Sequence, residues 1–330
     1  MKVSALLLLA RHHWDNVYGP AELERLKPHV QEPLAFYTDK SILEKPEILS
    51  QAEVIFSSWG MSVCDEPFLA SAPKLKAIFH AAGSIRPFMT GALWDRNITV
   101  TSSNSVLAIS VAEFALAQIL LSLKLTWRHV RDMRSERQPV RHTVPGIFDS
   151  VVGLVSVGSV ARHLISLLKP FRLRIVAFDP YLSPEQAKSL GIELVSLDQL
   201  FEISHVVSLH TPALPETEGM IRGGHFSRMI KSATFINTAR GSVVNEREMI
   251  DVLTRRSDLQ AILDVTHPEP PSPDSLLFSL PNVILTPHIA GPLDQECRRL
   301  GSMAVDEFER YVAGQPLRGE VTEKMMETIA

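Results

Sequence analysis

Residues 152–161 read Val-Gly-Leu-Val-Ser-Val-Gly-Ser-Val-Ala. The part before Ser156 is apolar and of strand length, and a helical pattern follows over 161–169. Between them Gly158 marks a tight turn. The stretch therefore predicts a strand, a turn and a helix in direct succession, which is the repeating unit of parallel α/β sheets.

The same succession of strand and helix recurs on both sides of this stretch. Apolar runs without alternation indicate strands that are buried on both faces of a parallel sheet. Helical patterns lie between them, for example over 183–189, 223–230 and 246–255. A long apolar helix expected over 111–133 separates an earlier series of strands from a later one, and a last helix is expected over 295–313. The strands are expected at 4–10, 53–57, 76–80, 99–101, 152–157, 174–178, 206–210, 234–237, 261–265 and 283–286. We therefore expect an α/β protein with two doubly wound parallel-sheet domains.

The turn at 156–161 has features of a dinucleotide-binding loop. In such loops a Gly-x-Gly-x-x-Gly pattern precedes a helix, whose free N-terminal N–H groups bind the pyrophosphate. Here Gly158 stands where the backbone approaches the pyrophosphate, and Ala161 is a mild change at the position of helix–strand packing. Ser156 is the clearer departure, because the first glycine serves the tight turn. An ordinary turn between strand and helix is the alternative interpretation.

Asp179 ends the next expected strand, about 20 positions after the loop. A carboxylate at this distance accepts hydrogen bonds from the adenosine ribose. It also repels a 2′-phosphate, so this residue favours NAD over NADP. Taken alone, Asp179-Pro180 is also a common start of a turn.

The composition excludes several classes of protein. The chain has 330 residues, a formal net charge of −4 and a pI of about 6.3. This length suggests two domains, and the lack of a basic excess argues against nucleic acid as a partner. Two cysteines, Cys64 and Cys297, are too few for a disulfide framework and favour a cytoplasmic location. No apolar run is expected to reach the ~18 residues of a membrane helix, and no spacing of histidines and acids suggests a metal site.

The N-terminal segment superficially resembles a signal peptide, because residues 5–10 are apolar. The run stops at Arg11, and no small-residue cleavage site follows it. We therefore expect a buried first strand here. Farther along, the charges of residues 131–144 are expected on a solvated connection into the second sheet.

Three later segments place reactive side chains directly after expected strands. The carboxyl ends of parallel strands meet at one edge of a sheet, which is where open α/β sheets bind ligands. Each side chain alone has an ordinary interpretation: a solvated arginine, an exposed loop glutamate, a structural histidine. Their combination in this order is far more specific. The segments are Asn237-Thr238-Ala239-Arg240-Gly241, Asp264-Val265-Thr266-His267-Pro268-Glu269 and Thr286-Pro287-His288-Ile289-Ala290-Gly291.

With these segments the chain closely resembles the D-isomer-specific 2-hydroxyacid dehydrogenase family. The resemblance extends from about residue 73 to residue 319 and includes His80-Ala81-Ala82-Gly83-Ser84 and His210-Thr211-Pro212. It implies a Rossmann-type NAD domain over 105–294. It also implies a discontinuous, flavodoxin-like substrate domain formed by 1–104 and 295–330.

The resemblance implies an NAD-dependent interconversion of a small 2-oxo acid and a D-2-hydroxy acid, with Arg240, Glu269 and His288 as the catalytic set. Arg240 binds the substrate carboxylate and polarises the carbonyl through its planar guanidinium. His288 gives a proton to the alkoxide and takes it back in the reverse direction. Glu269 favours the imidazolium and fixes the ring, and the nicotinamide supplies the hydride.

Further contacts follow from the same resemblance. Besides Arg240, the substrate carboxylate is expected at the backbone N–H groups of Ala82, Gly83 and Ser84. The residues implied to contact NAD are Gly158, Ser159, Val160, Asp179, His210, Thr211, Pro212, Asn237, Thr238, Ala239, Asp264, His288 and Gly291.

The chain also departs from the family pattern. Ile85-Arg86-Pro87 and Leu107 replace residues that many members have near the substrate loop. These changes concern the substrate more than the class of reaction. Arg86 either adds a cation to the expected cleft between the two domains or faces solvent. The expected helix 111–133 forms either a homodimer surface, as in the family, or part of the core.

Two other functions stay open. A relative acting on formate or phosphite would use the same scaffold. An NAD(H)-sensing interaction protein, resembling the C-terminal-binding transcriptional co-repressors, would tolerate the weakened glycine loop, whereas the intact set of Arg240, Glu269 and His288 favours an enzyme.

Overall fold

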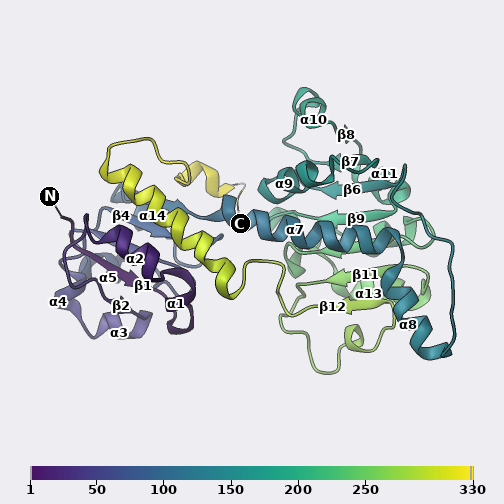
Figure 1. Cartoon of the computed structure of the whole chain (residues 1–330), viewed down its shortest axis with the longest axis horizontal. Helices are drawn as coiled ribbons and strands as arrows, with labels where there is room; N and C mark the ends of the chain where they lie inside the picture. Colours follow the sequence, from purple (N-terminus) through teal and green to yellow (C-terminus); the bar gives the residue numbers. More distant parts are fainter. Residues whose placement is uncertain (1, 328, 330) are drawn as a thin grey trace. The chain divides into compact units, whose positions relative to one another are not determined.

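The computed structural model describes residues 2–327 and 329. By its internal packing the chain divides into two compact units, Met1–Ala108 with Pro292–Ala330 and Ile109–Gly291. Each unit is built around one parallel sheet with helices on both faces (Figure 1). The fold class expected from the sequence is therefore confirmed.

The first unit contains a five-stranded sheet in the order β2-β1-β3-β4-β5. All its strand pairs are parallel, and this order is the flavodoxin-like one. β1 is buried, with Leu6, Leu7 and Leu8 at most 1% exposed, which confirms the expected buried first strand. The strands are β1 (Ala5–Leu8), β2 (Phe36–Tyr37), β3 (Val54–Ser57), β4 (Ala77–His80) and β5 (Thr99–Ser102).

Helices cover both faces of this sheet. On one face Phe308 of α14 meets Phe56 and Phe79 edge-on, with ring centroids 5.0 and 5.4 Å apart. That face is covered by α1 (Trp14–Val17), α2 (Pro20–Leu26) and α14 (Arg298–Val312). The other face is covered by α3 (Asp39–Leu43), α4 (Pro46–Leu49), α5 (Glu66–Ser71) and α6 (Gly91–Asp95).

The second unit contains a seven-stranded parallel sheet in the order β12-β11-β10-β9-β6-β7-β8. Counted from β6, this is the Rossmann order with one additional strand at the end. The strand order reverses between β6 and β9, which pair directly, and this switch point is where such sheets bind dinucleotides. The strands are β6 (Val151–Val155), β7 (Arg174–Phe178), β8 (Glu193–Leu194), β9 (Val206–Leu209), β10 (Thr234–Asn237), β11 (Gln260–Leu263) and β12 (Val283–Leu285).

The helices of the second unit also form two layers. One face of the sheet packs against α7 (Asn104–Leu123), α9 (Ser159–Leu168) and α10 (Pro184–Leu190). The other face packs against α11 (Leu197–Ile203), α12 (Gly223–Arg228) and α13 (Glu246–Arg255). Short 3-10 helices lie at Arg11–His13, Pro215–Thr217, Gly241–Val243, Leu276–Phe278, Asp294–Cys297 and Glu323–Glu327.

The expected helix 111–133 is wrong as a single element. The structure has α7, which begins earlier at Asn104, and a separate α8 (Thr126–Glu136). The break falls at Leu125, which has a left-handed backbone with φ 50°. No glycine or proline marks this position in the sequence, so no local signal predicted the break.

The expectation that no apolar segment reaches the length of a membrane helix is also wrong, because α7 is long and apolar enough to do so. About half of it is buried within the protein. Ala112, Ala115, Ile119 and Leu123 pack with β6 and α9 in one core cluster. At least one side of α7 is therefore apolar because it packs in the core of the protein.

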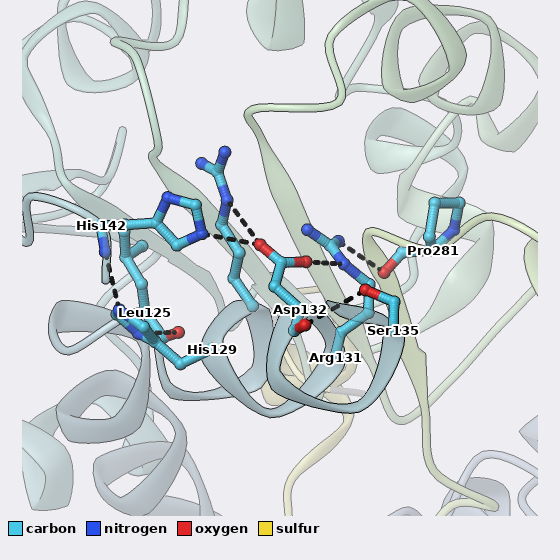
Figure 2. Close-up of polar contacts among 8 residues, drawn as sticks. Leu125, His129, Arg131, Asp132, Ser135, His142 and Pro281 are labelled. Carbon is cyan, nitrogen blue, oxygen red and sulfur yellow. Dashed lines mark hydrogen bonds and ion pairs between the residues drawn. The ribbon is translucent and has the colours of Figure 1, made fainter. Parts of the chain in front are cut away.

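The charged connection after α7 is anchored at Asp132. Its carboxylate accepts hydrogen bonds from Arg131 Nε at 2.7 Å and His142 Nε2 at 2.6 Å, and Arg128 Nε lies 3.7 Å away (Figure 2). Partial burial opposes ionisation of Asp132, but these hydrogen bonds outweigh it and lower its pKa. The prediction of solvated charges is thus wrong for Arg131, whose guanidinium also donates to the carbonyl of Pro281. The arginines of this segment that are exposed are Arg134, Arg137 and Arg141.

Candidate active site

Arg240, Glu269 and His288 follow three strands that are direct neighbours in the second unit. β10 pairs with β11, and β11 pairs with β12, all in parallel. The residues after these strands therefore emerge at one edge of the sheet, as the sequence predicts.

His288 and Glu269 are in direct contact. Nδ1 of His288 lies 2.5 Å from Oε1 of Glu269. Because an ionised carboxylate only accepts hydrogen bonds, Nδ1 carries the proton and Nε2 is left to exchange a proton with a substrate. The two side chains are 50% and 39% exposed, so the pair is accessible to a ligand.

The backbone holds His288 in an unusual conformation. Its φ is 54°, in the left-handed region that non-glycine residues rarely adopt. The His288 N–H donates to the carbonyls of Asp264 and Thr286, both at 3.0 Å. Such outliers are common at functional sites, where surrounding contacts fix a side chain in a required position.

The loop that carries Glu269 is fixed from two sides. The His267 N–H donates to Glu246 Oε2 of α13 at 3.0 Å, and the Thr266 hydroxyl donates to the carbonyl of Pro268 at 2.8 Å. Burial raises the pKa of Glu246, although the hydrogen bond from His267 opposes this shift. Glu246 carries no signal of this role in the sequence, because an acidic residue in the first turn of a helix is ordinary.

Arg240 lies on a tightly organised loop. The side chain of Asn237 accepts a hydrogen bond from the Ala239 N–H at 3.0 Å and donates to the carbonyl of Arg240 at 3.1 Å. A Cβ on Gly241 would lie 2.0 Å from the carbonyl carbon of Thr266, so only glycine fits there. Packing around the guanidinium lowers the pKa of Arg240 and the Glu269 charge opposes this shift, although much of the residue is exposed.

Asp264 is a buried anchor between two of the loops. One carboxylate oxygen accepts hydrogen bonds from the Thr286 hydroxyl at 2.5 Å and the Ile289 N–H at 2.8 Å. The other accepts one from the Ala290 N–H at 2.8 Å. The oxygen that accepts from the Ala290 N–H keeps acceptor capacity for a ligand, as the proposed contact of Asp264 with NAD requires.

A pocket of about 640 Å³ adjoins the histidine–glutamate pair within the second unit. Its polar lining residues are Asp264, Thr266, Glu269, Thr286 and His288. Its apolar lining residues are Pro270, Pro271, Phe278, Leu285 and Pro287. A small organic ligand therefore has both charged partners and an apolar wall at this edge.

The turn at residues 156–161, called the phosphate loop below, follows β6 at the switch point. Gly158 is the N-cap of α9, no side chain caps this end, and a Cβ on Gly158 would meet no atom within 4 Å. The free N–H groups and this open space suit a pyrophosphate. Asp179 accepts hydrogen bonds from the N–H groups of Val157 at 2.7 Å and Tyr181 at 2.8 Å. It therefore fastens the loop to the end of β7, in addition to any contact with a ribose.

Two polar atoms near this edge are buried without a hydrogen-bond partner among the described residues. They are His210 Nε2, after β9, and Thr238 Oγ1, after β10. Burial lowers the pKa of His210 to about 4, so its ring is neutral. Both residues were predicted to contact NAD, and unsatisfied groups at a ligand edge fit a polar cofactor. Of the other predicted contacts, Ser159 is exposed and Val160, Pro212 and Ala239 are half-buried.

The predicted substrate loop, Ala82-Gly83-Ser84, lies in the first unit after β4. The Ser102 hydroxyl contacts the carbonyls of Ala82 at 3.1 Å and Gly83 at 2.6 Å. These contacts involve the carbonyl groups of the loop and not its backbone N–H groups. His80 is buried beside Ser57, with Nδ1 and Oγ 2.8 Å apart, and burial lowers its pKa to about 3.

Arg86 is exposed, in agreement with one of the two expectations, and its guanidinium also binds backbone carbonyls. Its Nε donates to the carbonyl of Ile329 at 2.9 Å, and its Nη2 donates to the carbonyl of Met326. Arg86 therefore binds the C-terminal segment. Elsewhere in residues 2–327 and 329, no group of three or more His, Cys, Asp or Glu side chains is placed to hold a metal ion.

The strand order and the loop at the switch point are those of dinucleotide-binding α/β proteins, and comparison with known proteins narrows this class. The family model for "D-isomer specific 2-hydroxyacid dehydrogenase, NAD binding domain" matches residues 116–290. This chain therefore belongs to the D-isomer-specific 2-hydroxyacid dehydrogenase family, as predicted from its sequence, and NAD is its cofactor.

Individual relatives agree with this assignment. A D-3-phosphoglycerate dehydrogenase of Archaeoglobus fulgidus is 30% identical over 78% of this chain and 49% of the relative. A glyoxylate reductase of Korarchaeum cryptofilum is 29% identical over 76% of this chain and 77% of the relative. The structure of a phosphoglycerate oxidoreductase from Rhizobium etli has the same fold, with a TM-score of 0.82 and 22% identity over 99% of this chain and 100% of that one. The chain spans about half the length of the D-3-phosphoglycerate dehydrogenases that it matches.

Proposed function

We propose that this chain catalyses the NAD-dependent interconversion of a small 2-oxo acid and a D-2-hydroxy acid. The observation that carries the proposal is the contact of His288 Nδ1 with Glu269 Oε1 at 2.5 Å, at the sheet edge where Arg240 also emerges. An acid–base group and a permanent cation suit a substrate that has both a carboxylate and a carbonyl.

Each residue has a defined part in the reduction. Arg240 binds the carboxylate through its planar donor fork and polarises the neighbouring carbonyl. His288 donates its Nε2 proton to the carbonyl oxygen as that oxygen becomes an alkoxide, and Glu269 stabilises the imidazolium at Nδ1. In oxidation the neutral ring takes the proton from the hydroxyl. NAD, when bound, supplies or accepts the hydride at the substrate C2 atom.

The residues around the switch point are proposed to hold NAD. Gly158, Ser159 and Val160 offer backbone N–H groups to the pyrophosphate, and Asp179 accepts from the ribose. Thr238 and Asp264 offer a hydroxyl and a carboxylate to the nicotinamide end. For Ala82, Gly83 and Ser84 we keep the proposal that backbone N–H groups bind the substrate carboxylate.

The direct test follows NADH absorbance with glyoxylate, pyruvate, hydroxypyruvate and bulkier 2-oxo acids. We expect turnover with at least one of them, and we expect Arg240→Lys to lower kcat/KM by roughly a hundredfold or more, because lysine lacks the fork. NADH binding without turnover of any oxo acid would instead favour a sensor. Turnover of formate or phosphite alone would favour a formate or phosphite dehydrogenase.

We further propose that the chain forms a homodimer and works in the cytoplasm. On α7 the apolar side chains of Leu116, Leu120 and Leu121 are only partly buried, and association would cover them. Cys64 and Cys297 are buried and unpaired, as suits a reducing compartment. Light scattering should give the mass of a dimer for the purified chain and of a monomer for Leu120→Asp. A wild-type monomer would contradict the proposal.

A further inference from the structure

The phosphate loop keeps a side chain where dinucleotide-binding turns normally have none. Ser156 occupies the first glycine position and has φ 72°, well inside the left-handed region. Glycine adopts this conformation freely, whereas a residue with a Cβ is strained in it. The backbone at Ser156 thus has the conformation for which glycine is suited, and the serine in this position is strained.

The serine side chain bridges the switch point of the sheet. Ser156 follows β6 and Thr211 is close after β9, and these two strands are direct neighbours. The oxygens Ser156 Oγ and Thr211 Oγ1 lie 2.8 Å apart. Two hydroxyls therefore meet at the place where sheets of this type bind the dinucleotide.

The hydroxyl pair has two protons, and the Thr211 proton has two possible acceptors. Thr211, which is 3% exposed, has two acceptors available: Ser156 Oγ at 2.8 Å and the carbonyl of Val155 at 3.4 Å. The 2.8 Å contact is kept whichever hydroxyl donates, and at 3.4 Å the carbonyl of Val155 is a weak acceptor, so little is lost when Thr211 turns its proton to Ser156. When Thr211 donates to Ser156, the proton of the partly exposed Ser156 hydroxyl is available to a bound oxygen.

We propose that the Ser156 hydroxyl, oriented by Thr211, donates a hydrogen bond to the pyrophosphate of NAD. NAD binding in this chain then depends on a side chain at a position that glycine usually leaves bare. Ser156 contacts the cofactor, and Thr211 acts on it as a positioning residue. The inference uses the NAD site alone and is independent of the substrate proposed above.

Two substitutions at Ser156 test whether its hydroxyl contacts NAD or whether the serine is only a strained replacement for glycine. Ser156→Ala keeps the Cβ and removes the hydroxyl, whereas Ser156→Gly removes both. We expect each to weaken NADH binding about tenfold, as for loss of one hydrogen bond to a charged group. Unchanged or tighter binding by Ser156→Gly would overturn the proposal, because the serine would then be only a strained substitute. Binding is measured by titration of NADH fluorescence in the absence of substrate.

Ser232 offers a matched control. It also has a left-handed backbone, with φ 64°, but its N–H donates to Asp258 away from the switch point. Ser232→Gly relieves the same kind of strain, so it should raise the melting temperature without changing the NADH dissociation constant. A matching change in NADH affinity would mean that the effects at Ser156 arise from backbone relaxation, which would overturn the proposal.

A double-mutant cycle tests the role of Thr211. Thr211→Val should weaken NADH binding in the wild-type background and have much less effect in the Ser156→Ala background. Additive losses would show that Thr211 does not act through Ser156. Titration with ADP shows which end of the cofactor is contacted, since ADP has the pyrophosphate but no nicotinamide ribose. Equal losses for ADP and NADH support the proposal, whereas a loss for NADH alone would place the contact at the nicotinamide ribose and contradict it.

Discussion

Nδ1 of His288 lies 2.5 Å from Oε1 of Glu269, although the two residues follow different strands and are separated by a proline-rich loop. This contact sets the tautomer of the ring, because the carboxylate accepts the Nδ1 proton. Proton exchange with a substrate is thereby assigned to Nε2.

Replacing either member of this pair should lower turnover far more than it weakens NADH binding. We expect His288→Asn to reduce kcat roughly 10²–10⁴-fold, the usual contribution of a general acid–base group. Glu269→Gln should cost less, since the ring keeps a hydrogen-bond acceptor at Nδ1 and loses only its anionic partner. Full turnover by His288→Asn would remove it from the proposed mechanism.

Gly241→Ala should disrupt the same site from a distance. The added Cβ would lie 2.0 Å from the Thr266 carbonyl carbon, so the loops after β10 and β11 must separate. We expect a loss of several kcal/mol in unfolding free energy, as for overpacking against backbone, and a large loss of turnover. In Gly224→Ala on α12 a Cβ meets no atom within 4 Å, so this control should stabilise the protein by about 0.5–1 kcal/mol. Chemical denaturation measures both.

Asp132→Asn should loosen α8 and the connection that follows it. We expect a loss of about 1–3 kcal/mol in unfolding free energy, because Arg131 and His142 lose their charged acceptor. The pKa of Asp132 is lowered in the folded state, so its stabilisation is complete above the unfolded pKa of ~3.9 and is lost as pH falls through the folded value. Asp251→Asn on the exposed side of α13 is the control, and an equal loss there would contradict the assignment.

Acid should destabilise the protein through two buried histidines. Burial lowers the pKa of His80 to about 3 and of His210 to about 4. Between these values and the ordinary ~6.5, the unfolded chain binds a proton that the folded chain does not, so stability falls as pH decreases. Each residue contributes up to ~1.4 kcal/mol per pH unit. Melting temperatures between pH 7 and pH 5 should show this slope, and His80→Gln should reduce it; an unchanged slope would exclude His80 as a source.

The sequence carried most of the fold because its strands are buried on both faces. Arg174–Phe178 is apolar after its first residue, and Thr234–Asn237 has Phe235 and Ile236 between two polar ends. The bounds of both strands were predicted correctly. The strands β2 and β8 have two residues each, too few to form a pattern. The break at Leu125 had no signal either, since its cause is a backbone conformation without a glycine or proline.

For the site, the sequence identified the residues with reactive side chains and missed those that hold the reactive residues in place. Arg240, Glu269 and His288 stood in recognisable segments, and their strands are neighbours in the sheet. The hydrogen bond from the His267 N–H to Glu246 depends on two elements that only the folded chain brings together. The strained turn at Ser156 appeared in the sequence as a defect, whereas its hydroxyl contact with Thr211 required coordinates.

The proposed function depends on hydride transfer to the C2 atom of a 2-oxo acid and on protonation of the oxygen by His288. The most direct measurement incubates the purified chain with an accepted oxo acid and NADH deuterated at the transferred position, and then determines the configuration and deuterium content of the product. We expect a D-2-hydroxy acid with deuterium at C2, formed by the wild type and almost absent with His288→Asn. An L-product, or NADH binding with no labelled product from any oxo acid, would contradict it.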